Sequence, residues 1–136
     1  MVDFSTDIRG LKGIAEAALA TVKGSIDFTT AIRFRQNMDE ARAQGFRRFI
    51  MDMDGVTYIN SGGLSVLISL AGAGTPEASP LALLKVPPKI RVLIDLLKLG
   101  TAFHFCTTLE EAIEVVGRPS SSTNRAVALP GGQSTG

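Results

Sequence analysis

The chain has 136 residues, of which 45% are hydrophobic and 20% charged, with a formal net charge of +1. This length and composition indicate a single globular domain and exclude an intrinsically disordered chain. The near-neutral charge argues against direct binding of nucleic acid, and no apolar run is long enough to insert into a membrane. Because Cys106 is the only cysteine, neither an internal disulfide nor a thiolate metal cluster is available. We therefore expect a cytoplasmic protein without a metal or cofactor.

The first predicted element is ambiguous. The segment 15–22, AEAALATV, contains strong helix formers, but as a strand it places Ala18, Ala20 and Val22 on one face. The residues alone leave both alternatives open for residues 4–23. The Gly-Ser-Ile-Asp sequence at 24–27 is then expected to break regular structure.

A helix is clear after this break. Thr29 or Thr30 is its expected N-cap, and Gly45 is expected to end it. Its buried face follows helical spacing through Ala31, Phe34, Met38 and Ala41. The run 46–53, FRRFIMDM, predicts a short buried strand, and the Asp-Gly pair that follows is expected to form the turn that leaves it.

The rest of the chain alternates between helices and strands. Helices are expected at 64–70, 88–99 and 108–116, and strands at 80–86 and 102–105. Pro88 suits the first position of a helix, and Thr108 and Glu111 form a capping box. This alternation predicts an α/β fold with helices packed on a sheet. The Ser-, Gly- and Pro-rich segment 117–136 is expected to be a flexible tail, which leaves 1–116 as the domain.

The predicted helix 88–99 is apolar on two faces. The face expected to be buried consists of Ile90, Leu93, Ile94 and Leu97, and Gly100 is expected to close the helix. The second face consists of Val92, Leu96 and Leu99. It either packs under the helix 108–116 or contributes to a partner surface, and burial is the slightly favoured interpretation.

The segment 49–67, FIMDMDGVTYINSGGLSVL, contains two patterns linked to phosphate chemistry. In the first, Asp52 and Asp54 resemble the opening motif of haloacid-dehalogenase-type phosphatases, with one Asp as nucleophile and the other as acid/base. Such an enzyme also needs a later acidic pair at a strand end to hold Mg²⁺, and no acid after Asp54 is placed in that way. The chain is therefore not expected to be an enzyme, and the phosphatase is a distant alternative.

In the second pattern, Ser61 precedes Gly62, Gly63 and an apolar helix. A serine there is a natural N-cap, which on local features alone is the commoner role. A phosphate is also well accommodated at a helix N-terminus, and the two glycines leave the hydroxyl open to another protein. The local residues favour the cap but do not exclude a phosphate acceptor.

Three motifs together resemble a known family. KGSID at 23–27 is similar to a Gly-Glu-Leu-Asp motif, and NSGGL at 60–64 is similar to Asp-Ser-Ser-Gly-Leu. Pro87 and Pro88 occupy the place of a Ser-Pro pair. In this order, over residues 17–116, they resemble the STAS domain family and, within it, the bacterial anti-anti-sigma factors (anti-sigma factor antagonists). The resemblance implies a single STAS-type domain with a small mixed β-sheet flanked by about four helices.

The resemblance also implies a function in sigma-factor-dependent transcription. The unphosphorylated form would bind an anti-sigma factor that is also a serine kinase, phosphorylation of Ser61 would release it, and a phosphatase would reset Ser61. The residues that the resemblance assigns to shaping the site and the partner-binding surface are Asp27, Asn60, Gly62, Gly63 and Leu64.

Two positions depart from the family motif. Asn60 replaces the usual Asp and organises the turn without a charge, and Gly62 replaces the second Ser, so Ser61 is the only hydroxyl in the motif. An alternative function is a STAS subunit of a transporter or signalling scaffold that binds its partner constitutively. In that case Ser61 is only a cap.

Overall fold

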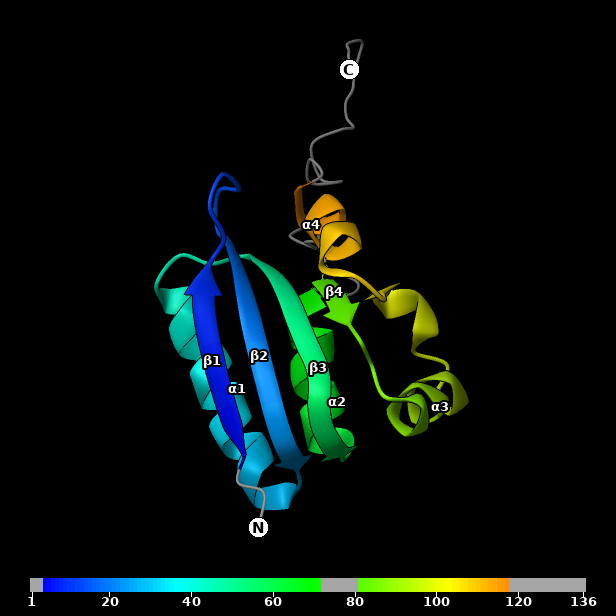
Figure 1. Ribbon diagram of the computed structural model, residues 1–136. Coiled ribbons are helices and arrows are strands. Elements are labelled where there is room, and N and C mark those ends of the chain that lie inside the picture. The colour runs from blue at the N-terminus through cyan, green and yellow to red at the C-terminus, as the bar shows by residue number, and fades with distance from the viewer. Residues whose placement is uncertain (1–3, 72–80, 118–136) are drawn as a thin grey trace, which may run out of the picture.

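The computed structural model describes residues 4–71 and 81–117. In these residues, five strands form one sheet in the order β1-β2-β3-β4-β5 (Figure 1). The strands are β1 Ser5–Gly10, β2 Ala17–Ile26, β3 Arg48–Ile59, β4 Leu81–Leu84 and β5 His104–Cys106. The helices are α1 Phe28–Ala43, α2 Ser61–Ala71, α3 Pro88–Leu96 and α4 Leu109–Gly117, with a 3₁₀ turn at Gly100–Ala102. The β1–β2 pair is antiparallel and the other pairs are parallel, which confirms the predicted mixed α/β fold.

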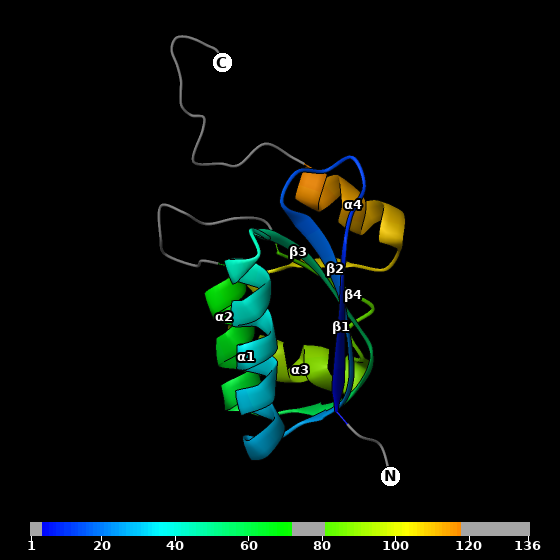
Figure 2. The same cartoon turned by 90° about the vertical axis from the view of Figure 1, so that its left-hand side faces the viewer.

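Helices lie on both faces of the sheet (Figure 2). The helices α1 and α2 pack against one face, where the main core includes Phe34, Met51 and Leu67. The helix α4 covers the other face with a smaller core that includes Ile50 and Ala112. Since successive strand residues point to opposite faces, β3 feeds both cores, which explains its almost continuous apolar run.

The ambiguous segment at the N-terminus folds as strands. Ala18, Ala20 and Val22 are fully buried in the main core, as the strand alternative required. The expected break at 24–27 was wrong, because β2 continues to Ile26 with Gly24 paired to Val56 of β3. Gly24 has a φ of 96°, and the register of the pair shifts beside it. Glycine tolerates this backbone conformation, so the strand bends without ending.

The strand β3 is longer than predicted, since Asp54 and Gly55 do not form a turn. Thr21 pairs with Asp52, whereas Lys23 pairs with Gly55, so β3 carries one extra residue here as a β-bulge. The Asp54 backbone N–H donates to the Asp52 side chain at 3.1 Å. Asp54 and Gly55, although typical of turns, therefore lie within a strand that remains paired with β2.

The helix α1 begins earlier than predicted, because Asp27 is its N-cap and not Thr29 or Thr30. The Asp27 carboxylate accepts the backbone N–H groups of Thr29 and Thr30, each at 3.0 Å. The Thr30 hydroxyl in turn accepts the Asp27 backbone N–H at 2.8 Å, which completes a capping box. The predicted buried face and the terminating role of Gly45, with a φ of 107°, are confirmed.

The helix α3 starts at Pro88 as predicted but ends earlier than expected. Its last residue is Leu96, and Lys98 with a φ of 60° turns the chain before Gly100 is reached. Ile90 and Ile94 are buried. Leu97 is half exposed, because it lies past the helix end and leaves the buried stripe.

The expected burial of the second apolar face of α3 under α4 was wrong. Val92 is 56% and Leu96 73% exposed, whereas Leu99 is partly buried against the main core. The helix α4 packs on the opposite face of the sheet, through Ala112 and other residues of the smaller core. Its predicted capping box is confirmed by the Glu111 carboxylate, which accepts the Thr108 backbone N–H at 3.1 Å. The expected tail, 117–136, lies outside the described residues apart from Gly117.

Candidate functional site

The Ser61 region lies where β2 and β3 end side by side. Ile26 pairs with Ile59, and the Asn60 backbone N–H donates to the Ile26 carbonyl at 2.9 Å. Asp27 then leads into α1, and Asn60 leads into α2. Since the two strands are parallel, these two helix starts are neighbours, and the sequence-predicted residues Asp27 and Asn60 are brought to the same edge of the sheet.

Asn60 caps α2, and the expected cap at Ser61 was wrong. The Asn60 side-chain oxygen accepts the Gly63 backbone N–H at 2.9 Å, and its carbonyl accepts the Leu64 backbone N–H at 3.0 Å. These are the two bonds of an N-cap residue. Ser61 is thus the first residue of α2, its side chain is exposed, and its hydroxyl has no hydrogen-bond partner among the described residues.

Gly63 and Leu64 lie beneath the loop and not on its surface. A Cβ atom on Gly63 would lie 2.6 Å from Ile26 Cγ2 and 2.7 Å from Ile59 Cγ1, so only glycine fits between the two strand ends. Leu64 is 2% exposed and packs in the main core. Because Gly63 and Leu64 are buried, they can affect partner binding only through the shape of the loop. Their role as site residues stays a prediction.

Gly62 sets how closely α1 and α2 approach each other beside Ser61. A Cβ atom here would lie 3.2 Å from the Asn60 side-chain oxygen and 3.3 Å from Ala31 Cβ. These contacts are tight, but a small shift of the neighbouring atoms would accommodate a Cβ atom at Gly62. The shorter distances at Gly63 leave no such room. The absence of a side chain at Gly62 therefore allows α1 and α2 to pack closely beside Ser61.

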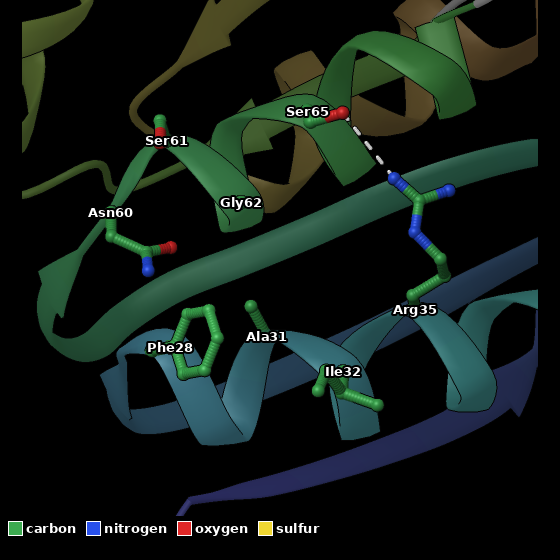
Figure 3. A pocket seen from close by; sticks show the side chains of 8 residues that line it. All are labelled: Phe28, Ala31, Ile32, Arg35, Asn60, Ser61, Gly62 and Ser65. Carbon is green, nitrogen blue, oxygen red and sulfur yellow. Dashed lines mark hydrogen bonds between the residues drawn. The ribbon is translucent and has the colours of Figure 1, made fainter.

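A pocket of about 350 Å³ lies between α1 and the start of α2 (Figure 3). It is lined by Phe28, Ala31, Ile32, Arg35, Asn60, Ser61, Gly62 and Ser65. Phe28 is 83% exposed and Ile32 56% exposed, which is unusual for large apolar side chains. Among the described residues that line the pocket, Arg35 is the only charged one, and its guanidinium donates to the Ser65 hydroxyl at 3.3 Å.

Phe28, Ile32 and Arg35 were not among the predicted site residues. The sequence did contain a signal for two of them, because Phe28 and Ile32 are apolar, are one helical turn apart and fall outside the buried stripe of α1. Their position beside Ser61 depends on how α1 packs against α2, which no local pattern specifies.

The Asp27 carboxyl group is held in its ionised form. The backbone N–H of Thr30 donates to it and lowers the pKa of Asp27 below its ordinary value, with a further contribution from the Thr30 hydroxyl. The negative charge at the first turn of α1 also interacts favourably with the helix dipole.

Asp52 and Asp54 do not have the geometry of a phosphatase site. That interpretation required the pair at the end of a strand, but both residues lie inside β3, which continues to Ile59. Within 4–71 and 81–117, no three His, Cys, Asp or Glu side chains lie together as metal ligands. No helix in the same residues has both the length and the hydropathy needed to span a membrane.

A family model described as STAS domain matches residues 7–112. The chain belongs to the STAS domain family. This confirms the resemblance that the motifs at 23–27 and 60–64 indicated, and the five-stranded sheet with four helices in the described residues agrees with it.

Solved structures with the same fold include regulators and a transporter. An anti-sigma factor antagonist from Mycobacterium paratuberculosis is 24% identical, with a TM-score of 0.71, and the match covers 84% of this chain and 94% of that one. The phosphorylated form of the Bacillus cell fate determinant SpoIIAA is 20% identical, with a TM-score of 0.60 and coverage of 81% and 97%. A murine anion transporter, Solute Carrier 26 family member A9, is 16% identical, with a TM-score of 0.62, and the match covers 84% of this chain but only 22% of the transporter. No curated protein matches the chain.

Proposed function

We propose that this STAS domain is an anti-sigma factor antagonist whose binding is switched by phosphorylation of Ser61. In this function the unphosphorylated protein binds an anti-sigma factor with serine kinase activity. The kinase transfers the γ-phosphoryl group of ATP to Ser61 Oγ, the hydroxyl loses its proton, and ADP leaves. The phosphorylated protein dissociates, and a phosphatase restores Ser61. The domain itself contributes no catalytic step.

The observation that carries this proposal is the free, exposed Ser61 hydroxyl at the first residue of α2. Asn60 supplies the cap, so Ser61 is not required for the helix start. A serine that served only as the N-cap would use its hydroxyl for the bond that the Asn60 side chain makes here.

The pocket beside Ser61 supports a partner surface. Phe28 and Ile32 expose large apolar side chains at its rim, and exposed groups of this kind mark interaction sites when they gather in one place. A partner that covers them would also cover Ser61, because the same pocket is lined by all three residues.

The direction of the switch follows from electrostatics. A phosphate on Ser61 adds a charge of about −1.5 to −2 at neutral pH. At the exposed start of α2 this charge is solvated and tolerated. Within a packed interface the same charge must be stripped of water, which weakens the complex unless the partner supplies basic groups.

The proposal is tested by incubating the protein with ATP and the candidate anti-sigma kinase and measuring its intact mass. We expect a gain of one phosphate that is lost in Ser61→Ala and retained in Ser65→Ala. Ser65 is a matched control, because it is exposed one turn further along α2 and lines the same pocket. A gain that persists in Ser61→Ala would refute the assignment of the acceptor.

A second candidate function is constitutive partner binding, as a subunit of a transporter or signalling scaffold. It is favoured by the transporter whose chain includes this fold as about a fifth of its length. Under this alternative the protein binds its partner with equal affinity as wild type and as Ser61→Glu. The switch predicts instead that Ser61→Glu weakens binding, which isothermal titration calorimetry would measure.

A further inference from the structure

We propose that Arg35 changes its binding partner with the phosphorylation state of Ser61. It binds a carboxylate of the partner protein when Ser61 is unphosphorylated, and it binds the phosphate when Ser61 is phosphorylated. This inference rests on the proposed function and names the chemistry of the partner and the means of its release. Arg35 lies on α1, outside the NSGGL motif at 60–64 that contains Ser61.

The position of Arg35 on the structure makes this contact available. Its guanidinium donates to the Ser65 hydroxyl at 3.3 Å, across the pocket between α1 and α2 (Figure 3). Ser61 lies one helical turn before Ser65, on the same side of α2, so the two side chains are about 6 Å apart. Arg35 is exposed. Because its side chain is long and flexible, we expect that it can rotate from Ser65 to a phosphate on Ser61.

The hydrogen bond that Arg35 makes to the Ser65 hydroxyl is weak. A neutral hydroxyl at 3.3 Å gives a guanidinium little compared with the paired bonds that a carboxylate or phosphate offers. The two ion pairs found among the described residues, Arg9–Asp7 and Arg91–Asp95, do not involve Arg35. The cation is therefore available to an incoming anion.

The lining of the pocket specifies what a partner must present. Its described residues include one cation, no acid, and two large exposed apolar side chains, Phe28 and Ile32. The complementary surface is an apolar side chain that fills the pocket beside a carboxylate that pairs with Arg35. The proposed occupant is thus a segment of the anti-sigma factor in which an Asp or Glu adjoins an apolar residue.

Phosphorylation then acts twice on this interface. It places a charge where the apolar side chain of the partner would sit, and it supplies a stronger local anion to the guanidinium. The carboxylate of the partner loses its cation and faces a phosphate of the same sign. The dissociation would follow without a rearrangement of the fold.

The contact with phosphate is tested without a kinase. Phosphoserine is incorporated at position 61 during synthesis, and the second pKa of the phosphate is followed by ³¹P NMR against pH. We expect the phosphate pKa in Arg35→Gln to be higher than in wild type by about 0.2 to 0.7 of a unit, the effect of an exposed ion pair. Asp27, at the start of α1, is present in all variants, so its effect cancels.

The matched control is Arg42→Gln. Arg42 lies two turns further along α1 and donates to the backbone oxygen of Ser69 at 2.8 Å and to its hydroxyl at 3.4 Å, outside the pocket. We expect its phosphate pKa to equal that of wild type. Equal values in wild type and Arg35→Gln would overturn the phosphate contact.

The partner contact is tested by binding to the anti-sigma factor. Arg35→Gln should weaken the unphosphorylated complex about five- to tenfold, and phosphoserine at position 61 should weaken it further by a smaller factor than in wild type. An unchanged affinity of Arg35→Gln would overturn the carboxylate contact. A chain that binds no anti-sigma factor would overturn the proposed function and this partner contact together, while the ³¹P titration still decides whether Arg35 holds the phosphate.

Discussion

The side-chain oxygen of Asn60 accepts the backbone N–H of Gly63 at 2.9 Å, and this bond releases Ser61 from the capping role. The family motif usually has Asp at the position of Asn60. Both side chains provide the acceptor oxygen that the cap requires, so the amide preserves the geometry of the loop and removes only the charge. The Ser61 hydroxyl therefore stays available in spite of the substitution.

Replacement of this cap should cost stability. Asn60→Ala removes the acceptor of the Gly63 N–H, and we expect the free energy of unfolding to fall by about 1 kcal/mol. Asn60→Asp keeps the acceptor and adds a favourable charge at the start of α2, so it should be at least as stable as wild type. Urea denaturation measures both, and equal losses in Asp and Ala variants would contradict the capping role.

Gly63 and Gly62 should respond differently to the same substitution. Both lie in the first turn of α2, so Ala changes the helix propensity similarly at each. Only Gly63→Ala drives a Cβ atom into Ile26 and Ile59 at the strand ends, at 2.6 and 2.7 Å. We expect Gly63→Ala to be less stable than Gly62→Ala by about 2 kcal/mol in thermal or urea unfolding. Equal stabilities would mean that the strand ends yield without cost.

The parts of the fold that the sequence predicted correctly are those whose pattern of residues extends over a whole element or over several elements. The continuous apolar run of β3 predicts a buried strand, because a strand that is buried on both faces does not alternate between apolar and polar residues. The order of elements and the NSGGL motif were enough to place Ser61 at the start of a helix. The cap was assigned one residue too late, since Asn and Ser are both good N-caps and the sequence alone does not choose between adjacent ones.

The errors arose where pairing between strands overrode local preference. Asp54 and Gly55 are typical turn residues, as is Gly24, yet all three lie within strands. The register shifts between β2 and β3 absorb them as bulges, which depend on the neighbouring strand and leave no local signal.

The pocket beside Ser61 could not be derived from the sequence for a related reason. Phe28 and Arg35 reach it because α1 and α2 pack side by side, and that closeness depends on Gly62 facing Ala31. The helical spacing of the apolar residues in α1 correctly predicted which of them face the core. It did not identify what the exposed residues face.

The lowered pKa of Asp27 predicts a contribution to stability that depends on pH. Because the folded-state pKa lies below the unfolded value, the contribution is complete above the unfolded pKa and is lost as pH falls through the folded one. Asp27→Asn keeps the cap oxygen but does not titrate, so its free energy of unfolding should decline less than that of wild type below about pH 4. Denaturant unfolding at several pH values tests this, and parallel declines would contradict it.

A residual decline in Asp27→Asn is expected from Glu111. The backbone N–H of Thr107 lowers the pKa of this carboxyl in the same manner at the start of α4. The double variant Asp27→Asn, Glu111→Gln should therefore have a flatter acid limb than either single variant. If the double variant matched Asp27→Asn, Glu111 would have no such role.

Phe28 and Ile32 should contribute to partner binding and not to stability. Both are mostly exposed, so Phe28→Ser and Ile32→Ser remove little buried surface from the free protein, whereas a bound partner would cover them. We expect each to weaken binding of the anti-sigma factor about tenfold in calorimetry, with an unfolding free energy within about 0.5 kcal/mol of wild type. Leu109→Ser is the control, because Leu109 is a 41% exposed apolar residue on α4, across the sheet from this pocket. If Leu109→Ser weakened binding as much as Phe28→Ser, the effect would reflect general loss of apolar surface, and the pocket between α1 and α2 would not be the place where the partner docks.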